Sequence, residues 1–305
     1  MEGRMTYGET IARLLDAAGP AAPAATEGPA HACGAGVLQK EQSQRPPIDA
    51  VALRYALERN EINAHFQPQF DLQTDQVCGV EALARWHHPH FGPVAPEQFV
   101  PLAEANGLIV DLTRTIMSQA LQEAVTANAA GHALSVSLNL SPMLLESPEL
   151  AEELGSVAQQ HGVPAGRITF EITERAMLPE LAVALGALTR LRLRGFGLSL
   201  DDYGTGRSSL RQLTRIPFSE IKIDRSLVHG AHQHEEQRAR LRAAIQIADE
   251  LGVCTVAEGV EDFRDRQLIR HYGCARAQGW LFKAALSGTE LMEWLAAYNG
   301  RHPAG

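Results

Sequence analysis

Seven polar residues each stand at or near the C-terminal end of a different apolar run in this 305-residue chain. They are Glu81, Asn139, Glu171, Asp201, Lys222, Glu258 and Gln278, and Asp202 follows directly after Asp201. A carboxylate inside an apolar strand needs a partner, because burying an unpaired charge is costly. Carboxylate and amide oxygens are the ligands that hard cations such as Mg²⁺ and Mn²⁺ prefer. The pattern therefore predicts one shared polar site suited to divalent cations.

The elements that must position these residues alternate between strand-like and helical patterns. A helix is predicted over Asp49–Asn60. Strands over Asn63–Phe70 and Val77–Arg85 follow, with a turn at residues 73–75, and such a short link permits only antiparallel pairing. Further strands are predicted over Leu134–Leu140, Ile168–Ile172, Gly197–Asp201, Glu220–Asp224, Val253–Glu258 and Ala275–Phe282, with helices over Leu181–Arg194 and Glu235–Leu251.

Repeated strand and helix units of this kind imply an α/β fold with a mostly parallel sheet. Only a closed barrel brings the carboxyl ends of all its strands to one mouth, whereas an open sheet spreads them along a line. We therefore predict a TIM-like (β/α)8 barrel with an antiparallel first strand. Trp280 and Phe282 are expected in its wall. Adjacent residues of a strand point to opposite faces, so the backbone must bend for Asp201 and Asp202 to share a site.

Composition bounds the remaining possibilities. Residues 1–47 are predicted to be a short N-terminal segment and an Ala-, Pro- and Gly-rich flexible linker, and residues 48–300 to be the folded domain. The net charge of −9, with no Lys/Arg-rich run, argues against binding polymeric nucleic acid or an anionic membrane. The four cysteines form no CxxC pair, and neither a signal peptide nor an apolar span is found. A cytoplasmic protein without membrane contact from this chain is expected.

The motifs that carry a family resemblance appear in order along the chain. The most specific string is Glu81-Ala82-Leu83-Ala84-Arg85-Trp86. The others are Phe66-Gln67-Pro68-Gln69, Asn139-Leu140-Ser141, Glu171-Ile172-Thr173-Glu174, Asp201-Asp202-Tyr203-Gly204-Thr205-Gly206, Lys222-Ile223-Asp224, Glu258-Gly259-Val260-Glu261 and Gln278-Gly279. Together they cover about Asp49 to Leu295 and resemble the EAL-domain cyclic di-GMP phosphodiesterases, whose fold matches the predicted barrel.

The resemblance implies hydrolysis of cyclic di-GMP to linear pGpG with two Mg²⁺ or Mn²⁺ ions, and inhibition by Ca²⁺. It implies that Glu81, Asn139, Glu171 and Asp201 surround one ion, and that Asp201, Asp202 and Glu258 surround the other. Lys222 and Gln278 would act beside Glu81, Asp201 and Glu258 in catalysis. Gln67, Arg85 and Asp224 would contact the substrate, and Glu174 would fix the loop after Asp202. A homodimer is also implied.

Several plainer interpretations remain open. Glu81 could form an ion pair with Arg85, Lys222 could merely neutralise the carboxylates, and Glu174 could cap a helix. His87, His88 and His90 suggest a loop after the strand rather than a zinc site, because no cysteine accompanies them. The main alternative function is a catalytically silent receptor for cyclic di-GMP. A sugar-phosphate enzyme is disfavoured, since it would not need this many carboxylates.

Overall fold

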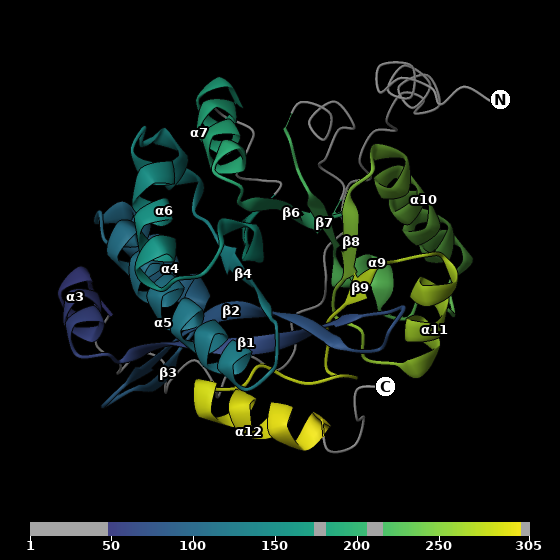
Figure 1. Cartoon of the computed structure of the whole chain (residues 1–305), viewed down its shortest axis with the longest axis horizontal. Coiled ribbons are helices and arrows are strands. Elements are labelled where there is room, and N and C mark those ends of the chain that lie inside the picture. Colours follow the sequence, from purple (N-terminus) through teal and green to yellow (C-terminus); the bar gives the residue numbers. More distant parts are fainter. Residues whose placement is uncertain (1–47, 174–180, 206–215, 300–305) are drawn as a thin grey trace, which may run out of the picture.

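The computed structural model describes residues 48–173, 181–205 and 216–299 (Figure 1). The predicted segment 1–47 lies outside these residues. The strands are β1 Ile62–Asp71, β2 Val77–His88, β3 Gly92–Val94, β4 Ser135–Asn139, β5 Ile168–Thr173, β6 Gly197–Tyr203, β7 Glu220–Ile223, β8 Cys254–Ala257 and β9 Arg276–Ala277. The helices are α3 Ala50–Glu58, α4 Pro96–Ala105, α5 Ile109–Ala129, α6 Leu150–Gln160, α7 Leu181–Leu193, α9 Arg225–Val228, α10 Glu235–Leu251, α11 Phe263–His271 and α12 Gly288–Asn299.

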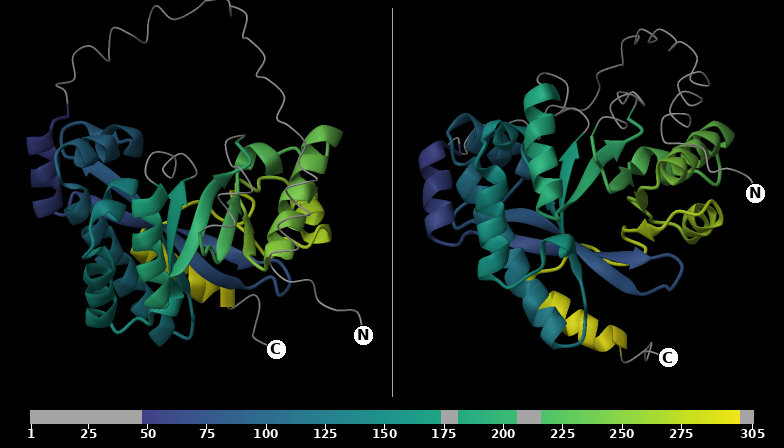
Figure 2. Two further views of the ribbon diagram at one scale, coloured as in Figure 1. Left: turned by 90° about the horizontal axis from the view of Figure 1, so that it is seen from above. Right: turned by 45° about the horizontal axis from the view of Figure 1, so that its top comes forward.

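Eight strands close into a barrel in the order β1, β9, β8, β7, β6, β5, β4, β2, and the β1–β2 pairing completes the ring. β1 is antiparallel to both of its neighbours, while the other strands of the ring pair in parallel. This confirms the predicted TIM-like barrel with an antiparallel first strand. Helices α3 to α7 lie on one side of the barrel, α10 and α11 on the other, and α12 lies beneath β1 (Figures 1 and 2).

Side chains along each strand point alternately outward, toward the helices, and inward, into the barrel. This alternation determines which residues face the site. In β7, Ile221 and Ile223 face outward into the apolar layer beneath the helices, while Glu220 and Lys222 face the barrel interior. β5 and β6 follow the same rule, with Phe170 and Leu200 outward. The interior is therefore unusually polar for a barrel, since bulky branched side chains commonly fill it. Buried polar residues include Gln69, Glu81, Ser137, Glu171, Ser199, Glu220, Lys222 and Gln278.

Two sequence predictions were wrong at the ends of strands. The predicted strand Ala275–Phe282 is only two residues long, because the chain turns at Gly279, whose φ is 155°. A Cβ at Gly279 would overlap the backbone of Val260, so only glycine fits this close approach. Trp280 is consequently 73% exposed and lies outside the wall, whereas Phe282 stacks on Phe70 with ring centroids 4.6 Å apart.

The second difference concerns the histidines after Arg85. His87 and His88 belong to β2, which continues to His88 and pairs with β3, so they do not lie in a loop as predicted. His88 stacks on Phe91, with ring centroids 4.5 Å apart.

Among the described residues, no helix is both long enough and apolar enough to cross a membrane.

Candidate active site

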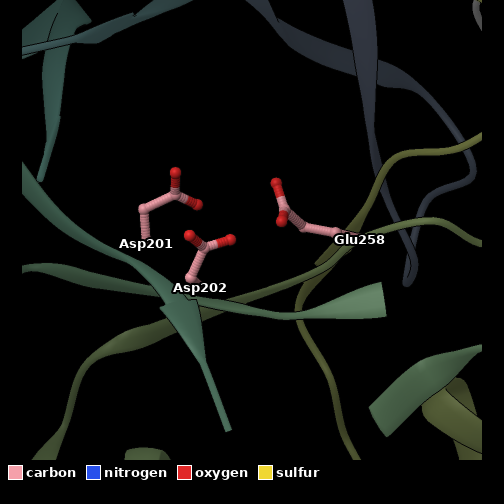
Figure 3. Close-up of side chains that lie close together, drawn as sticks. All are labelled: Asp201, Asp202 and Glu258. Atoms are coloured by element: carbon pink, nitrogen blue, oxygen red, sulfur yellow. The ribbon is translucent and has the colours of Figure 1, made fainter. Parts of the chain in front are cut away.

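The carboxylates at the barrel mouth are brought together by a local distortion of β6. Asp202 has a φ of 60°, in the left-handed region that Asp tolerates better than most residues. This bend turns two consecutive aspartates toward Glu258, which follows β8 (Figure 3). Ligand oxygens of Asp201, Asp202 and Glu258 all lie within 4.8 Å of one another. The predicted bend is confirmed, and it creates a three-carboxylate cluster.

Lys222 is the centre of the mouth. It projects from β7, its side chain is 1% exposed, and its Nζ contacts carboxylates from four different strands or strand ends. The distances are 2.7 Å to Glu258, 2.8 Å to Glu171, 3.1 Å to Glu81 and 3.5 Å to Asp201. One ammonium group thus forms ion pairs with four carboxylates. The alternative in which Glu81 pairs with Arg85 finds no support, since Glu81 pairs with Lys222.

Gln278, which directly follows β9, bridges two of these carboxylates. Its Nε2 donates to Glu81 Oε2 at 2.6 Å and to Glu258 Oε1 at 3.0 Å. Asn139 makes a similar contact, because its Nδ2 donates to Glu81 Oε1 at 3.1 Å. That contact leaves the carbonyl oxygen of Asn139 as the atom that could bind a cation.

Burial and charge move the proton affinities of the mouth in opposite directions. Burial and the negative charge of Glu81 raise the pKa of Glu171 well above its usual range. Burial is also the main reason that the pKa of Glu258 rises to about 8, although Lys222 opposes it. The pKa of Glu81 is lowered: burial alone would raise it, but the charge of Lys222 and the bond from Gln278 outweigh that effect. The surrounding acids hold the pKa of Lys222 well above its usual value despite burial.

This donor set fits divalent cations. The mouth holds five carboxylates (Glu81, Glu171, Asp201, Asp202 and Glu258) and one lysine, which pairs with four of them. When all five are ionised, four negative charges remain unbalanced by Lys222. Glu171 Oε1 is buried without a hydrogen-bond partner among the described residues. Buried acids repel one another unless protons or cations neutralise them. All the available oxygens are hard ligands of the kind that Mg²⁺ and Mn²⁺ take.

A cavity of about 650 Å³ opens beside the carboxylates and extends between β2, β4, α4 and α5. Arg85 lines it together with the acids of the mouth. Gln67 faces the interior directly opposite Glu81 in the β1–β2 register, and its Nε2 lies 3.5 Å from Lys283 O. Asp224 caps α9 by accepting from Ser226 N at 2.9 Å. The structure therefore brings Arg85 into the cavity and shows a structural bond at Asp224.

Glu174 and most of the loop after Asp202 lie outside the described residues, so the proposed loop contact stays a prediction. Sequence reasoning assigned no role to Gln69, Glu220 or Arg276, which also face the barrel interior. Gln69 is 1% exposed and donates from Nε2 to Gln278 Oε1 at 3.1 Å. The only available signal was its place in the Phe66–Gln69 motif. Glu220 pairs with Arg276 at 3.2 Å, deeper in the barrel.

A TIM-like barrel with buried acids clustered at the carboxyl ends of its strands defines the class of this protein. Residues 50–285 match the EAL domain family, and the chain belongs to it.

Relatives and solved structures agree with this assignment. The chain is 34% identical over 256 residues to the cyclic di-GMP phosphodiesterase RocR of Pseudomonas aeruginosa, covering 84% of this chain and 65% of RocR. It is 36% identical to the cyclic di-GMP phosphodiesterase NbdA of the same organism, covering 81% and 32% of the two chains. The structure of PaMucR phosphodiesterase in complex with c-di-GMP superimposes with a TM-score of 0.73 at 33% identity, covering 78% of this chain and 97% of that one.

The chain is shorter than many of its relatives. It covers only 35% of an uncharacterised protein of Azorhizobium caulinodans that is 37% identical over 258 residues. Other curated relatives are similarly long, and the chain spans about a third of their length. The shared region is the barrel.

Proposed function

We propose that this protein hydrolyses cyclic di-GMP to linear pGpG in a reaction that depends on divalent cations. The observation that carries the proposal is Lys222, buried among four carboxylates at the mouth of the barrel and beside a cavity. The names of RocR and NbdA support this substrate, as does the similarity to the c-di-GMP complex of PaMucR. The homodimer and the division at residue 47 remain predictions.

The mouth has enough oxygen ligands for two cations. We assign Glu81, Asn139, Glu171 and Asp201 to one site, and Asp201, Asp202 and Glu258 to the other, with Asp201 shared. When bound, such a pair of ions activates water and neutralises the attacking and leaving oxygens of a phosphodiester. The three-carboxylate cluster supports the second site, and the unpartnered Glu171 Oε1 supports the first.

The chain's own residues supply positioning and charge. Lys222 carries a fixed positive charge, since its pKa is held far above neutrality, and it is placed to stabilise negative charge that develops on the phosphate. Gln278 holds Glu81 and Glu258 in place and can hydrogen-bond near the attacking water. Arg85 lines the cavity, where its guanidinium can pair with a phosphate, and Gln67 and Asp224 are assigned to substrate contacts.

The reaction balances without any further reactant. The oxygen of one water forms a bond to phosphorus, and the bond between phosphorus and the 3′-oxygen of the neighbouring ribose breaks. That 3′-oxygen leaves as a hydroxyl after taking up a proton, and the phosphate remains on the 5′ side. Opening a single linkage of the ring gives linear pGpG.

The test is to incubate the protein with cyclic di-GMP and Mg²⁺ or Mn²⁺ and to separate the nucleotides by chromatography. Accumulation of pGpG supports the proposal. Binding of cyclic di-GMP without turnover at any metal concentration would reject hydrolysis and establish the receptor alternative. Failure to bind the nucleotide would contradict both functions.

A further inference from the structure

We infer that Gln69 is a positioning residue that fixes the orientation of the Gln278 amide and thereby raises the cation affinity of the barrel mouth. This inference deepens the proposed function and rests on its assignment of the mouth as a cation site. Gln69 projects from β1 and does not line the cavity, and within the described part of the chain its side chain donates to Gln278 and not to a carboxylate. Its influence would pass through Gln278.

The hydrogen bonds at Gln278 run in one direction. Its Nε2 donates to Glu81 at 2.6 Å and to Glu258 at 3.0 Å, and its Oε1 accepts from Gln69 Nε2 at 3.1 Å. An ionised carboxylate can only accept, and Glu81 is the acid whose pKa is lowered, so the NH₂ group of Gln278 must face Glu81. Its carbonyl oxygen must then face Gln69, which has to present a donor. The acid thus determines the orientation of the Gln278 amide, and the Gln278 oxygen in turn determines the orientation of the Gln69 amide.

The backbone of Gln278 is already held without Gln69. Gln278 N donates to Ala257 O at 2.9 Å, and Gln278 O accepts from Val260 N at 3.1 Å. These bonds place the residue but do not fix the rotation of its terminal amide, which is broad and nearly two-fold. The orientation of the amide therefore depends on its side-chain hydrogen bonds: the two acids accept from its NH₂ group, and the bond from Gln69 holds its oxygen.

The surroundings of Gln69 show that its amide is kept at a cost. Its Oε1 is buried with no hydrogen-bond partner among the described residues, an arrangement that typically costs about 1–3 kcal/mol. An aliphatic side chain of the same size would avoid that cost. Gly79 lies directly opposite Gln69, and a Cβ there would come 3.3 Å from Gln69 Oε1 and overlap Ser135 Oγ. What the Gln69 amide contributes in return is the hydrogen bond to Gln278.

Replacing Gln69 by leucine should leave the Gln278 oxygen buried without a donor. Only the bonds to Glu81 and Glu258 then hold the amide, so it is less firmly oriented and positions the two acids less well. Partners that orient metal ligands from outside commonly change affinity or activity by 10–100-fold when removed. We expect Gln69→Leu to weaken Mn²⁺ binding roughly 10-fold. At saturating Mn²⁺, kcat should fall more than KM rises, because the site and not the nucleotide cavity is disturbed.

The experiment is a double-mutant cycle on the full chain with wild type, Gln69→Leu, Gln278→Leu and the double variant. Mn²⁺ affinity is measured by electron paramagnetic resonance of the free ion, without substrate, and kcat is then measured at saturating Mn²⁺. The double variant should bind Mn²⁺ no more weakly than Gln278→Leu, since Gln69 acts through Gln278. Additive losses, or wild-type affinity in Gln69→Leu, would overturn the inference.

Gln119→Leu is the matched control. Gln119 also makes two amide hydrogen bonds, to Ala64 N and Ile62 O of β1, but on the helix side of the barrel. It should retain wild-type Mn²⁺ affinity. If Gln69→Leu does not fold, Gln69→Met keeps the size without the donor; if neither folds, Gln69 is structural and the inference is wrong. Coupled Mn²⁺ losses in proteins that form no pGpG would reject the proposed function alone, whereas normal hydrolysis with an additive cycle would reject this inference alone.

Discussion

The barrel interior contains two layers of buried charge that are built on opposite principles. At the mouth lie five carboxylates and a single lysine, Lys222, which pairs with four of them. One layer deeper, Glu220 faces a single cation, Arg276, with Glu220 Oε2 and Arg276 Nη1 3.2 Å apart. The deeper layer is balanced within the protein, while the mouth is balanced only by protons or added cations. A fold can keep such an imbalance where a ligand supplies the missing charge.

Removing divalent cations is the largest test of this contrast. Treatment with a chelator should reduce phosphodiesterase activity to background, because the acids of the mouth then have only protons and Lys222 as counter-charge. Mg²⁺ or Mn²⁺ should restore it. Ca²⁺ should not, since its larger and looser coordination shell suits a two-cation site poorly. Product formation is the measurement, and full activity in metal-stripped protein would contradict the contrast.

Lys222→Ala should produce the next largest effect. Removing a charge aimed at the transition state typically lowers turnover on the order of 10²–10³-fold. Affinity for cyclic di-GMP should change much less, because Arg85 and the cavity remain. Turnover is measured at saturating Mn²⁺ beside the dissociation constant of the nucleotide.

The plainer interpretation of Lys222 gives a different outcome. A lysine that only neutralises carboxylates would lower metal affinity and thermal stability when lost, and excess metal would restore the rate. If Mn²⁺ alone returned the variant to near wild-type turnover, Lys222 would have a structural role, like the charges of the Glu220–Arg276 pair.

The residues of the mouth could be predicted well from the sequence, because each is marked by its immediate neighbours in the chain. Each polar residue interrupts its own apolar run, and strand alternation together with barrel closure brings the runs to one mouth. Even the bend at Asp202 followed from two adjacent acids that had to share a site. The end of the last strand failed for a non-local reason: the turn at Gly279 is set by its approach to Val260.

The deeper layer, formed by Glu220 and Arg276, and the role of Gln69 could not be predicted in this way. Glu220 and Arg276 are 56 residues apart and lie on different strands, so their pairing depends on the register of the closed barrel. Gln69 stands in a recognised motif, yet its role depends on the direction of hydrogen bonds that begin at Glu81 and Glu258. Neither relation leaves a periodic signal in the chain.

Arg276→Met should affect stability and spare turnover. It leaves Glu220 buried without its cation, and breaking a buried pair can cost about 3–5 kcal/mol. Because the Arg276 side chain is 31% exposed and Glu220 can take up a proton, we expect about 1–3 kcal/mol. Urea unfolding measures this loss, and kcat at saturating Mn²⁺ should stay within about twofold of wild type, well short of the effect expected at the mouth.

The double variant Glu220→Leu/Arg276→Met is the control for that prediction. Replacing both members of a buried pair by apolar residues is often neutral or stabilising, so much of the lost stability should return. If instead Arg276→Met lowered kcat as strongly as Lys222→Ala, the two layers would not be separate, and the deeper pair would belong to the site.

The smallest expected effect is a pH dependence that comes from Glu220 alone. Burial raises the pKa of Glu220, and Arg276 opposes this only in part. The folded protein therefore binds a proton more tightly than the unfolded chain does. The stability contributed by that proton is fully present below the unfolded pKa and is lost as pH rises through the folded pKa. The variant Glu220→Gln cannot titrate at this position, so it serves as the reference. The free energy of unfolding of the wild type minus that of Glu220→Gln should fall as pH rises above about 4.5. The slope should be at most about 1.4 kcal/mol per pH unit. Urea unfolding in excess Mg²⁺ measures this difference, because the acids of the mouth are common to both proteins and cancel. A difference that rises with pH would mean that Arg276 outweighs burial, and that the deeper pair is held as an ion pair throughout.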